Sequence, residues 1–286
     1  MEYVGRFAPS PTGPLHAGSL LAALASFLDA RSARGRWLLR IDDIDPPREV
    51  SGSVGWIEQT LAAHGLHPDG TCDFQSSHRE AYDAALQTLV QGGHLFHCYC
   101  TRTTLGAHGC CIRDCAGQSD PARQDGRQGA SLRVKVPKDT IITFDDVILG
   151  RQTFALGATL SDFIVRRRDG LYAYQLAAAV DDAAPGISHV MRGKDLLDST
   201  PRQQFLQRCL SLESPQYGHL PVLTDSHGVK LSKQTGAVAV DNNNPAGNIR
   251  EALKQLGQAI PPMDLTSVED LLSFATRHWR RERIPK

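Results

Sequence analysis

The fold is decided by residues 3–30, which read YVGRFAPSPTGPLHAGSLLAALASFLDA. The apolar run at residues 3–7 is typical of a buried strand, and the Pro/Gly-rich segment 10–14 predicts a turn. The segment after the turn places apolar side chains on one face of a helix, at Leu20, Leu21, Leu24, Phe27 and Leu28. A second apolar run at residues 37–41 completes a strand–helix–strand unit. This unit predicts an α/β fold with a parallel sheet and a right-handed crossover.

Sheets of this kind bind ligands at the carboxyl ends of their strands. Residues 8–18 and 42–45 occupy those positions in this sequence. The turn brings His16 and Gly18 to the start of a helix, where free backbone N–H groups and the helix dipole attract anions. We expect Gly18 to let a phosphate or an adenine ring approach the backbone, and His16 to donate to a phosphate.

Further elements follow from the pattern of apolar residues. Helices are predicted at residues 54–64, 79–91, 200–212, 245–256 and 267–279. Strands are predicted at residues 132–136, 141–149 and 162–166. The polar, Gly-rich stretch 116–130 predicts a mobile loop between them.

The composition is that of a folded enzyme. The 286 residues include 31 Lys+Arg and 31 Asp+Glu, and 41% are hydrophobic, which excludes disorder and coiled coil. No run approaches the roughly 18 to 20 apolar residues that cross a bilayer, and the N-terminus lacks a signal pattern. We expect a cytoplasmic protein with no membrane partner. The zero net charge neither favours nor excludes nucleic acid.

The cysteines indicate a metal site. Five of the seven fall within 18 positions, at Cys98, Cys100, Cys110, Cys111 and Cys115. Seven are too few for a disulfide scaffold in a chain of this length, and two close ligands, a loop and two more ligands is the spacing of a structural zinc site. Cys110 and Cys111 compete for the third position. His94, His97 and His108 are rival ligands, and reduced cysteines without metal are the alternative.

Two lysines, Lys230 and Lys233, lie three apart on a Gly-flanked stretch that reads KLSKQ. Lysines with this spacing can both reach one polyphosphate and neutralise the charge that develops on a leaving pyrophosphate. A lysine pair alone is usually solvated surface. Its occurrence downstream of the His16 turn makes the combined signal strong.

Residues 16–19 (HAGS) and 230–234 (KLSKQ) resemble the HIGH and KMSKS signatures of class I aminoacyl-tRNA synthetases. Residues 6–13 (RFAPSPTG) and 40–45 (RIDDID) are similar to the glutamyl branch. The resemblance implies a Rossmann-type catalytic domain at 1–240, with a zinc-bearing insertion at about 96–130. It leaves a short helical segment at 241–286 and no anticodon-binding domain. A shortened glutamyl-type enzyme with a zinc site resembles the glutamyl-queuosine tRNA(Asp) synthetases.

The resemblance implies a function. Such enzymes activate L-glutamate with ATP and Mg²⁺ and esterify it onto queuosine in an anticodon, so the expected partners are ATP, L-glutamate and the tRNA(Asp) anticodon stem-loop. We expect a monomer. One alternative is an ordinary glutamyl-tRNA synthetase that charges a tRNA 3′ end. A nonenzymatic paralogue that binds glutamyl-adenylate or RNA as a sensor is another.

The resemblance also assigns residues. The catalytic set is His16, Lys230 and Lys233, and the ATP-binding set is Pro11, His16, Gly18, Ser19 and Lys233. The glutamate-binding set is Arg6, Phe7, Ala8, Pro9, Ser10, Asp42, Tyr174 and Arg192. The family pattern places the zinc ligands at Cys98, Cys100, Cys111 and Cys115. Asp42 stands where the family usually has Glu, so a direct contact with the substrate ammonium and a contact through water both stay open.

Other charged segments have simpler interpretations. The pair Asp181–Asp182 follows an apolar run and predicts a strand-end turn. Arg40, Asp43 and Asp45 suit either the pocket or a surface ion-pair network. The arginines at 166–168 and in the tail 280–283 are candidates for phosphate contacts, although a solvated helix end is equally expected for the tail.

Overall fold

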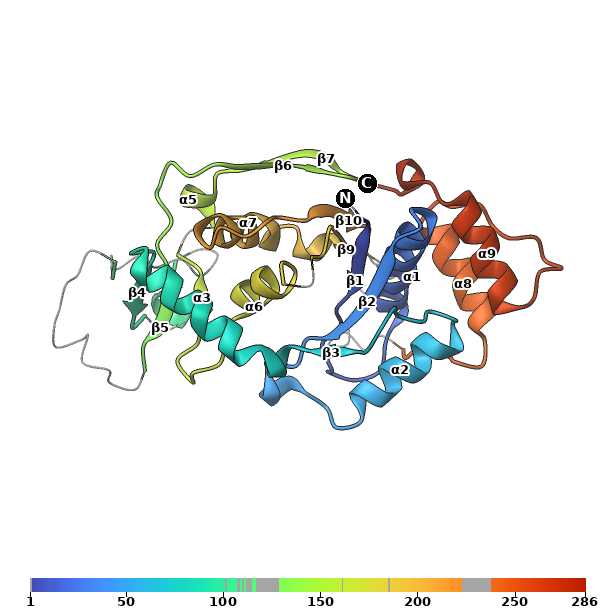
Figure 1. Ribbon diagram of the computed structural model, residues 1–286, viewed down its shortest axis with the longest axis horizontal. Helices are drawn as coiled ribbons and strands as arrows, with labels where there is room; N and C mark the ends of the chain where they lie inside the picture. The colour runs from blue at the N-terminus through green and yellow to red at the C-terminus, as the bar shows by residue number, and fades with distance from the viewer. Residues whose placement is uncertain are drawn as a thin grey trace.

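The computed structural model is shown in Figure 1. It describes residues 2–100, 102–106, 109, 111, 115–116, 129–160, 162–184, 186–222 and 238–286. Lys230, Lys233 and Cys110 lie outside these residues, as do residues 117–128 of the predicted loop.

A five-stranded sheet of order β10-β9-β1-β2-β3 forms the centre of the molecule (Figure 1). Its strands are β1 (Val4–Phe7), β2 (Arg36–Ile41), β3 (Asp73–Phe74), β9 (His189–Gly193) and β10 (Gln216–Leu220). All four neighbouring pairs run parallel. The predicted α/β class and the parallel strand–helix–strand unit are therefore confirmed.

Helix α1 (Ala17–Ser32) connects β1 to β2 and buries all five of the apolar side chains predicted for its inner face. Its Phe27 meets Trp37 of β2 edge to face, with ring centroids 5.3 Å apart. Helices α8 (Pro245–Gln255) and α9 (Val268–His278) pack against α1 on its far side (Figure 1). Helix α2 (Ser53–Ala63) contributes Ile57 and Leu61 to the same core.

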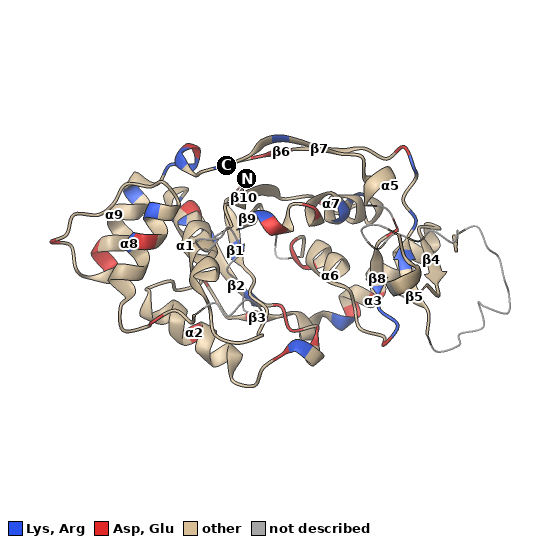
Figure 2. Cartoon of the chain, turned by 180° about the vertical axis from the view of Figure 1, so that it is seen from behind, with Lys and Arg blue, Asp and Glu red and all other residues tan. Residues whose placement is uncertain are grey.

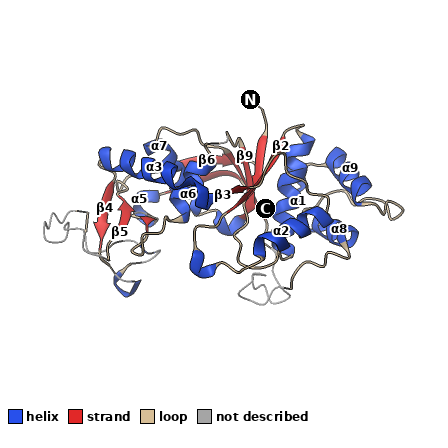
Figure 3. Ribbon diagram, turned by 60° about the horizontal axis from the view of Figure 1, so that its bottom comes forward, coloured by secondary structure: helices blue, strands red, loops and turns tan. Residues whose placement is uncertain are grey.

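The opposite face of the sheet packs against a second core formed by α3 (Arg79–Gln91), α6 (Tyr174–Asp181) and α7 (Ser199–Cys209). Successive residues of β9 serve the two cores, because Val190 joins this one and Met191 joins the core around α1. That alternation is the two-residue period of a strand. The sheet is consequently covered by helices on both sides (Figure 3).

A smaller antiparallel sheet lies away from the central sheet (Figure 1). It contains β4 (Leu95–Cys98), β5 (Ser131–Val134) and β8 (Ile164–Arg166). The hairpin of β6 (Ile142–Asp146) and β7 (Gly150–Phe154), followed by the short α5 (Leu156–Thr159), returns toward the central sheet. The prediction of one strand over 141–149 is wrong, because Asp146 accepts the amides of Ile148 and Leu149 and ends β6 in a turn.

The C-terminal tail folds back onto α1 through Asp29, whose carboxylate is buried. Asp29 accepts from the Tyr3 hydroxyl, from Trp279 Nε1 at 2.8 Å and from Arg281 Nε at 2.6 Å. Arg281 is therefore paired with a buried carboxylate, and the expectation of a solvated helix end is wrong at this residue. Elsewhere Lys/Arg and Asp/Glu are interspersed along the elements (Figure 2).

The helices predicted from periodicity are confirmed to within a few residues, as α2, α3, α7, α8 and α9. Strands β9 and β10 have no counterpart among the predictions, because their buried faces carry polar side chains such as Arg192 and His219. In the described part of the chain no helix has the length and hydropathy that a membrane crossing requires.

Candidate active site

A cavity of about 820 Å³ opens at the carboxyl ends of the central strands. All eight predicted glutamate-binding residues line it: Arg6, Phe7, Ala8, Pro9, Ser10, Asp42, Tyr174 and Arg192. The lining also includes three of the predicted ATP-binding residues, His16, Gly18 and Ser19. Pro11 does not line the cavity; it is buried, and its carbonyl accepts from the Val50 amide at 2.9 Å.

Arg192 of β9 is a buried cation whose hydrogen-bond partners are all neutral. Its Nη1 donates to Gln203 Oε1 at 2.8 Å and to the Tyr174 hydroxyl at 3.3 Å, and its Nη2 donates to Thr200 Oγ1 at 2.7 Å. Its Nε donates to His219 Nε2 at 3.3 Å. No carboxylate among the described residues lies within ion-pair distance of this guanidinium. A buried cation without a counter-ion that faces a cavity favours an anionic ligand.

Arg6 of β1 is held in the opposite way, by a carboxylate. Its Nε and Nη2 donate to the two oxygens of Asp182, at 3.1 and 3.0 Å. Burial alone would raise the pKa of Asp182, but the charges of Arg6 and Arg40 outweigh burial and hold that pKa well below its usual range. Asp182 is therefore ionised, and it neutralises much of the charge that Arg6 brings to the cavity.

Arg40 of β2 connects this pair to Asp42. Its Nε donates to Asp42 Oδ1 at 2.8 Å, and its Nη1 donates to Asp182 Oδ1 at 2.7 Å. Arg40 is only 4% exposed, so the surface ion-pair interpretation is wrong for this residue. Asp43 does fit a surface role, because its exposed contacts are to the amide and hydroxyl of Ser76.

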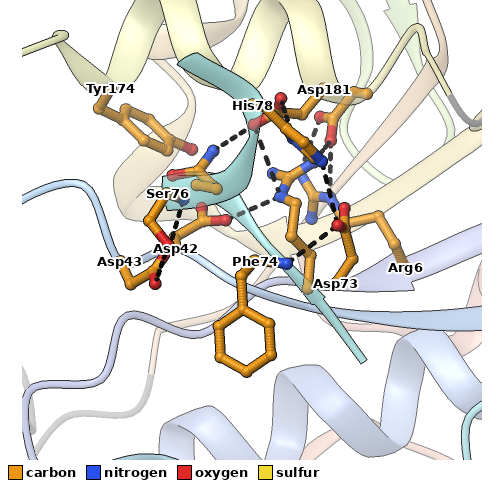
Figure 4. A network of polar contacts seen from close by, with 12 residues as sticks. Arg6, Asp42, Asp43, Asp73, Phe74, Ser76, His78, Tyr174 and Asp181 are labelled. Atoms are coloured by element: carbon orange, nitrogen blue, oxygen red, sulfur yellow. Dashed lines mark hydrogen bonds and ion pairs between the residues drawn. The ribbon is translucent and has the colours of Figure 1, made fainter. Parts of the chain in front are cut away.

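Asp181 and Asp182 end helix α6, and the prediction of a strand-end turn is wrong. Asp181 accepts from Gln75 at 2.6 Å and from the Tyr82 hydroxyl at 2.7 Å, and His78 bridges it to Asp73 (Figure 4). Carboxylates are disfavoured at a helix C-terminus, where the dipole is negative. Two adjacent acids at the end of an apolar run are thus a sequence signal that could have predicted buried cationic partners for Asp181 and Asp182.

Arg6 and Asp42, which line the cavity, belong to a buried network that holds three carboxylates, those of Asp42, Asp181 and Asp182, against the two guanidiniums of Arg6 and Arg40 and the imidazole of His78. Burial raises the pKa of Asp42, more than its arginine neighbours lower it. A ligand ammonium beside Asp42 would add the missing positive charge.

The start of α1 forms the other end of the cavity. His16 is the N-cap residue, and its Nδ1 accepts from the Ser19 amide at 3.3 Å while its Nε2 lies 3.1 Å from Ser19 Oγ. A Cβ on Gly18 would lie 3.1 Å from Cε1 of the His16 ring. The absence of a side chain at Gly18 therefore makes room for the His16 imidazole. The sequence predicted that it makes room for a phosphate or an adenine ring.

The flanks of the lysine segment both reach the cavity, although Lys230 and Lys233 themselves lie outside the described residues. Val222, before the segment, lines the cavity. After it, Ala239 forms a β-bridge with His16, and the Val240 amide donates to the Leu15 carbonyl at 2.9 Å. The chain that follows the lysine segment therefore pairs with the start of α1.

The structure brings together the four predicted zinc ligands. The sulfur atoms of Cys98, Cys100, Cys111 and Cys115 all lie within 4.8 Å of one another. Cys100 Sγ is 3.8 Å from both Cys111 Sγ and Cys115 Sγ. Tetrahedral zinc with bonds of about 2.3 Å separates its sulfurs by about 3.8 Å, so this donor set fits the ion. Burial raises the pKa of Cys98, and it raises the pKa of Cys115 to about 12, so a cation is needed to hold them as thiolates.

Comparison with known proteins agrees with this site. Residues 2–256 match the family model of the catalytic domain of class I tRNA synthetases (E and Q). A glutamyl-Q tRNA(Asp) synthetase of Xanthomonas campestris pv. campestris (strain 8004) is 45% identical over 100% of this chain and 94% of its own. One from Burkholderia cenocepacia (strain HI2424) is 48% identical over 99% of this chain and 98% of its own.

Among solved structures, the glutamate-tRNA synthetase from Elizabethkingia anophelis superimposes with a TM-score of 0.82 at 24% identity. The match covers 99% of this chain and 67% of that one, and it establishes a shared fold. Because the family model covers most of the chain and the curated relatives match almost end to end, the chain belongs to the class I tRNA synthetases of the E and Q type, and within them to the glutamyl-Q tRNA(Asp) synthetases.

Proposed function

We propose that this protein activates glutamate with ATP and transfers it to queuosine in the anticodon of tRNA(Asp). The observation that carries the proposal is the cavity that joins the N-terminus of α1 to the uncompensated cation of Arg192 and to Asp42. The names of the curated relatives support the same reaction.

Glutamate offers two carboxylates and one ammonium. Arg192 binds one carboxylate, because its charge has no carboxylate partner among the described residues. Arg6, already shared with Asp182, contributes at the second carboxylate together with the hydroxyl of Ser10. Asp42 takes the ammonium. Only its Oδ1 is engaged by Arg40 in the described part of the chain, which leaves Oδ2 for the ligand or for a bridging water.

Activation joins glutamate to ATP. The α-carboxylate of glutamate attacks the α-phosphorus of ATP, a carboxylate oxygen–phosphorus bond forms, and the bond to pyrophosphate breaks. His16, the N–H groups at the start of α1 and the lysines of the KLSKQ segment stabilise the charge that moves onto the leaving pyrophosphate. Mg²⁺ bound with ATP would supply further positive charge there. No protein nucleophile is needed, because positioning and electrostatics lower this barrier.

Transfer completes the reaction. A hydroxyl of the queuosine cyclopentene ring attacks the carbonyl of glutamyl-adenylate, an ester forms, and AMP leaves. Because the accepting group is part of the anticodon loop, the loop itself must enter the cavity, and the anticodon stem-loop is the proposed minimal substrate.

We propose zinc as the metal of the four-cysteine cluster, since four thiolates complete a tetrahedral shell and leave no open position for catalysis. The ion supplies local folding energy for the insertion that contains β4. Cys72 and Cys209, outside the cluster, are free, which suits a reducing cytoplasm. We also propose that the active form is a monomer.

The test uses ATP, labelled glutamate and either queuosine-containing or unmodified tRNA(Asp). We expect label only on the queuosine-containing tRNA, and we expect it to remain after the 3′-terminal adenosine is removed. Loss of the label with that adenosine would instead identify 3′-end charging. The absence of glutamate-dependent pyrophosphate exchange in every condition would indicate a nonenzymatic binding protein.

The stem-loop proposal has its own measurement. A queuosine-bearing anticodon stem-loop should accept glutamate at a rate within about tenfold of the full tRNA, a difference of roughly 1.4 kcal/mol in the barrier. A stem-loop that stays unlabelled while the full tRNA is labelled would show that other parts of the tRNA are required.

A further inference from the structure

His219 of β10 lies directly beside Arg192 of β9. The two are register partners in the parallel pair β9–β10, so their side chains leave the sheet on the same face. His219 is fully buried, with no exposed surface. Its ring stacks beside Tyr217, and the Arg192 guanidinium lies 4.9 Å from the Tyr217 ring centroid. Neither the predicted sites nor the proposed reaction assigns this histidine a role.

The environment of His219 selects one tautomer. Its Nδ1 lies 2.5 Å from Asp146 Oδ2, and an ionised carboxylate requires a donor at that position. Burial acts to raise the pKa of Asp146, but the hydrogen bonds from His219 and from two backbone amides outweigh it and lower that pKa. Burial also lowers the pKa of His219, so the ring is neutral near pH 7. With the proton on Nδ1, the lone pair of Nε2 faces Arg192 Nε at 3.3 Å and Thr200 Oγ1 at 3.0 Å.

Neutral partners of this kind hold the Arg192 guanidinium without cancelling its charge. A guanidinium has five N–H donors. The contacts with Gln203, Tyr174, Thr200 and His219 use one donor each, which fixes the plane of the group. A carboxylate at the position of His219 would neutralise Arg192 in the way that Asp182 neutralises Arg6. Asp146 instead lies behind the imidazole and strengthens Nε2 as an acceptor.

We propose that His219, oriented by Asp146, is a positioning residue that fixes the Arg192 guanidinium for binding a glutamate carboxylate. The proposal rests on the proposed function only in the identity of the ligand. The orientation of Arg192 by His219 is a property of the ligand-free protein, and it can be measured without substrate.

A purely structural role is the competing explanation, and Asp146 variants cannot separate the two. Oδ1 of Asp146 also accepts the amides of Ile148 and Leu149, so its loss would disrupt the β6–β7 turn. Variants of His219 are more selective. His219→Gln places an amide oxygen near the position of Nε2, whereas His219→Asn places its amide near Nδ1 and removes the acceptor of the Arg192 Nε–H.

The kinetic experiment measures glutamate-dependent pyrophosphate exchange. We expect His219→Gln to keep the KM for glutamate within about threefold of wild type, and His219→Asn to raise it by about 10- to 100-fold, as loss of one hydrogen bond to a charged group predicts. The kcat and the KM for ATP should change by less than about threefold in both. The positioning role would be overturned if both variants raised the KM for glutamate equally. It would also be overturned if kcat fell as much as KM rose.

The second experiment uses ¹⁵N NMR of the ligand-free protein. In wild type, His219 should carry its proton on Nδ1 with Nε2 unprotonated, and the Arg192 Nε–H should exchange slowly. Exchange should remain slow in His219→Gln and become fast in His219→Asn. A protonated Nε2 in wild type overturns the proposal even if no variant folds. Suppose that wild type gives the expected spectrum but shows no glutamate-dependent pyrophosphate exchange. The proposed function then fails, and the orientation of Arg192 by His219 stands.

Discussion

Arg6 and Asp182, 176 positions apart in sequence, form a buried ion pair through two hydrogen bonds of 3.1 and 3.0 Å. Arg192, which also lines the cavity, is surrounded by neutral acceptors. One arginine is therefore compensated within the protein and the other is left to be compensated by a ligand. We therefore expect changes at Arg192 to affect mainly ligand binding, and changes in the Arg6–Asp182 pair to affect mainly the stability of the fold.

Arg192→Gln should abolish most glutamate binding with little loss of stability. The substitution removes a buried cation that has no carboxylate partner among the described residues, so the folded state loses an unfavourable charge together with its hydrogen bonds. We expect the KM for glutamate to rise at least about 100-fold, which is about 2.7 kcal/mol, and the free energy of unfolding in urea to change by less than about 1 kcal/mol. A KM within about threefold of wild type would exclude Arg192 as a carboxylate ligand.

Asp182→Asn should destabilise the fold strongly. It leaves Arg6 and Arg40 buried without their shared carboxylate, and breaking a buried pair typically costs about 3–5 kcal/mol. Urea denaturation measures the change. The matched control is Asp169→Asn, in an exposed pair with Arg167, which should cost no more than about 1 kcal/mol. Similar values for the two variants would contradict the buried-network description.

Acid should destabilise wild type more steeply than Asp182→Asn. The pKa of Asp182 in the folded protein lies below its unfolded value of about 3.9, so its contribution to stability is complete above that value and is lost as the pH falls toward the folded pKa. Urea unfolding between about pH 5 and pH 2 gives the slopes. Parallel slopes would show that Asp182 has an ordinary pKa in the native state.

Cys98→Ser should release the metal and leave the central sheet folded, because the sulfur cluster belongs to a small apolar cluster of its own and not to the core around α1. We expect about one zinc per wild-type chain by elemental analysis and less than about a tenth of an equivalent in the variant. Cys72→Ser, at a free cysteine outside the cluster, should retain the metal. A wild-type protein purified without chelator that holds no zinc would exclude a closed thiolate site.

Lys233→Ala should lower the rate of glutamate-dependent pyrophosphate exchange by about two to three orders of magnitude, the usual effect of losing one group that stabilises transition-state charge. The affinity for glutamate should barely change. Lys254→Ala, on the exposed side of α8, serves as the control and should leave both quantities unaltered. Equal losses in glutamate affinity and rate would place Lys233 in ground-state binding instead.

Local sequence patterns predict the helices and strands whose apolar residues recur with a regular spacing. The inner face of α1 and the strands β1 and β2 follow from residues 3–41, because one apolar stripe and two apolar runs leave few alternatives. The turn that delivers His16 to the helix follows from Pro and Gly in the same way. The spacing of the cysteines likewise indicates a metal cluster, since its ligands lie close in sequence.

The polar interior could not be predicted in this way. The sequence by itself determined the α/β class and the start of α1, because these depend on neighbours within a few turns or strands. Only the tertiary structure decided that Asp182 neutralises Arg6 while His219 leaves Arg192 charged. Those contacts join residues far apart in sequence, and burial, which sets their strength, exists only once the sheet and its helices have packed.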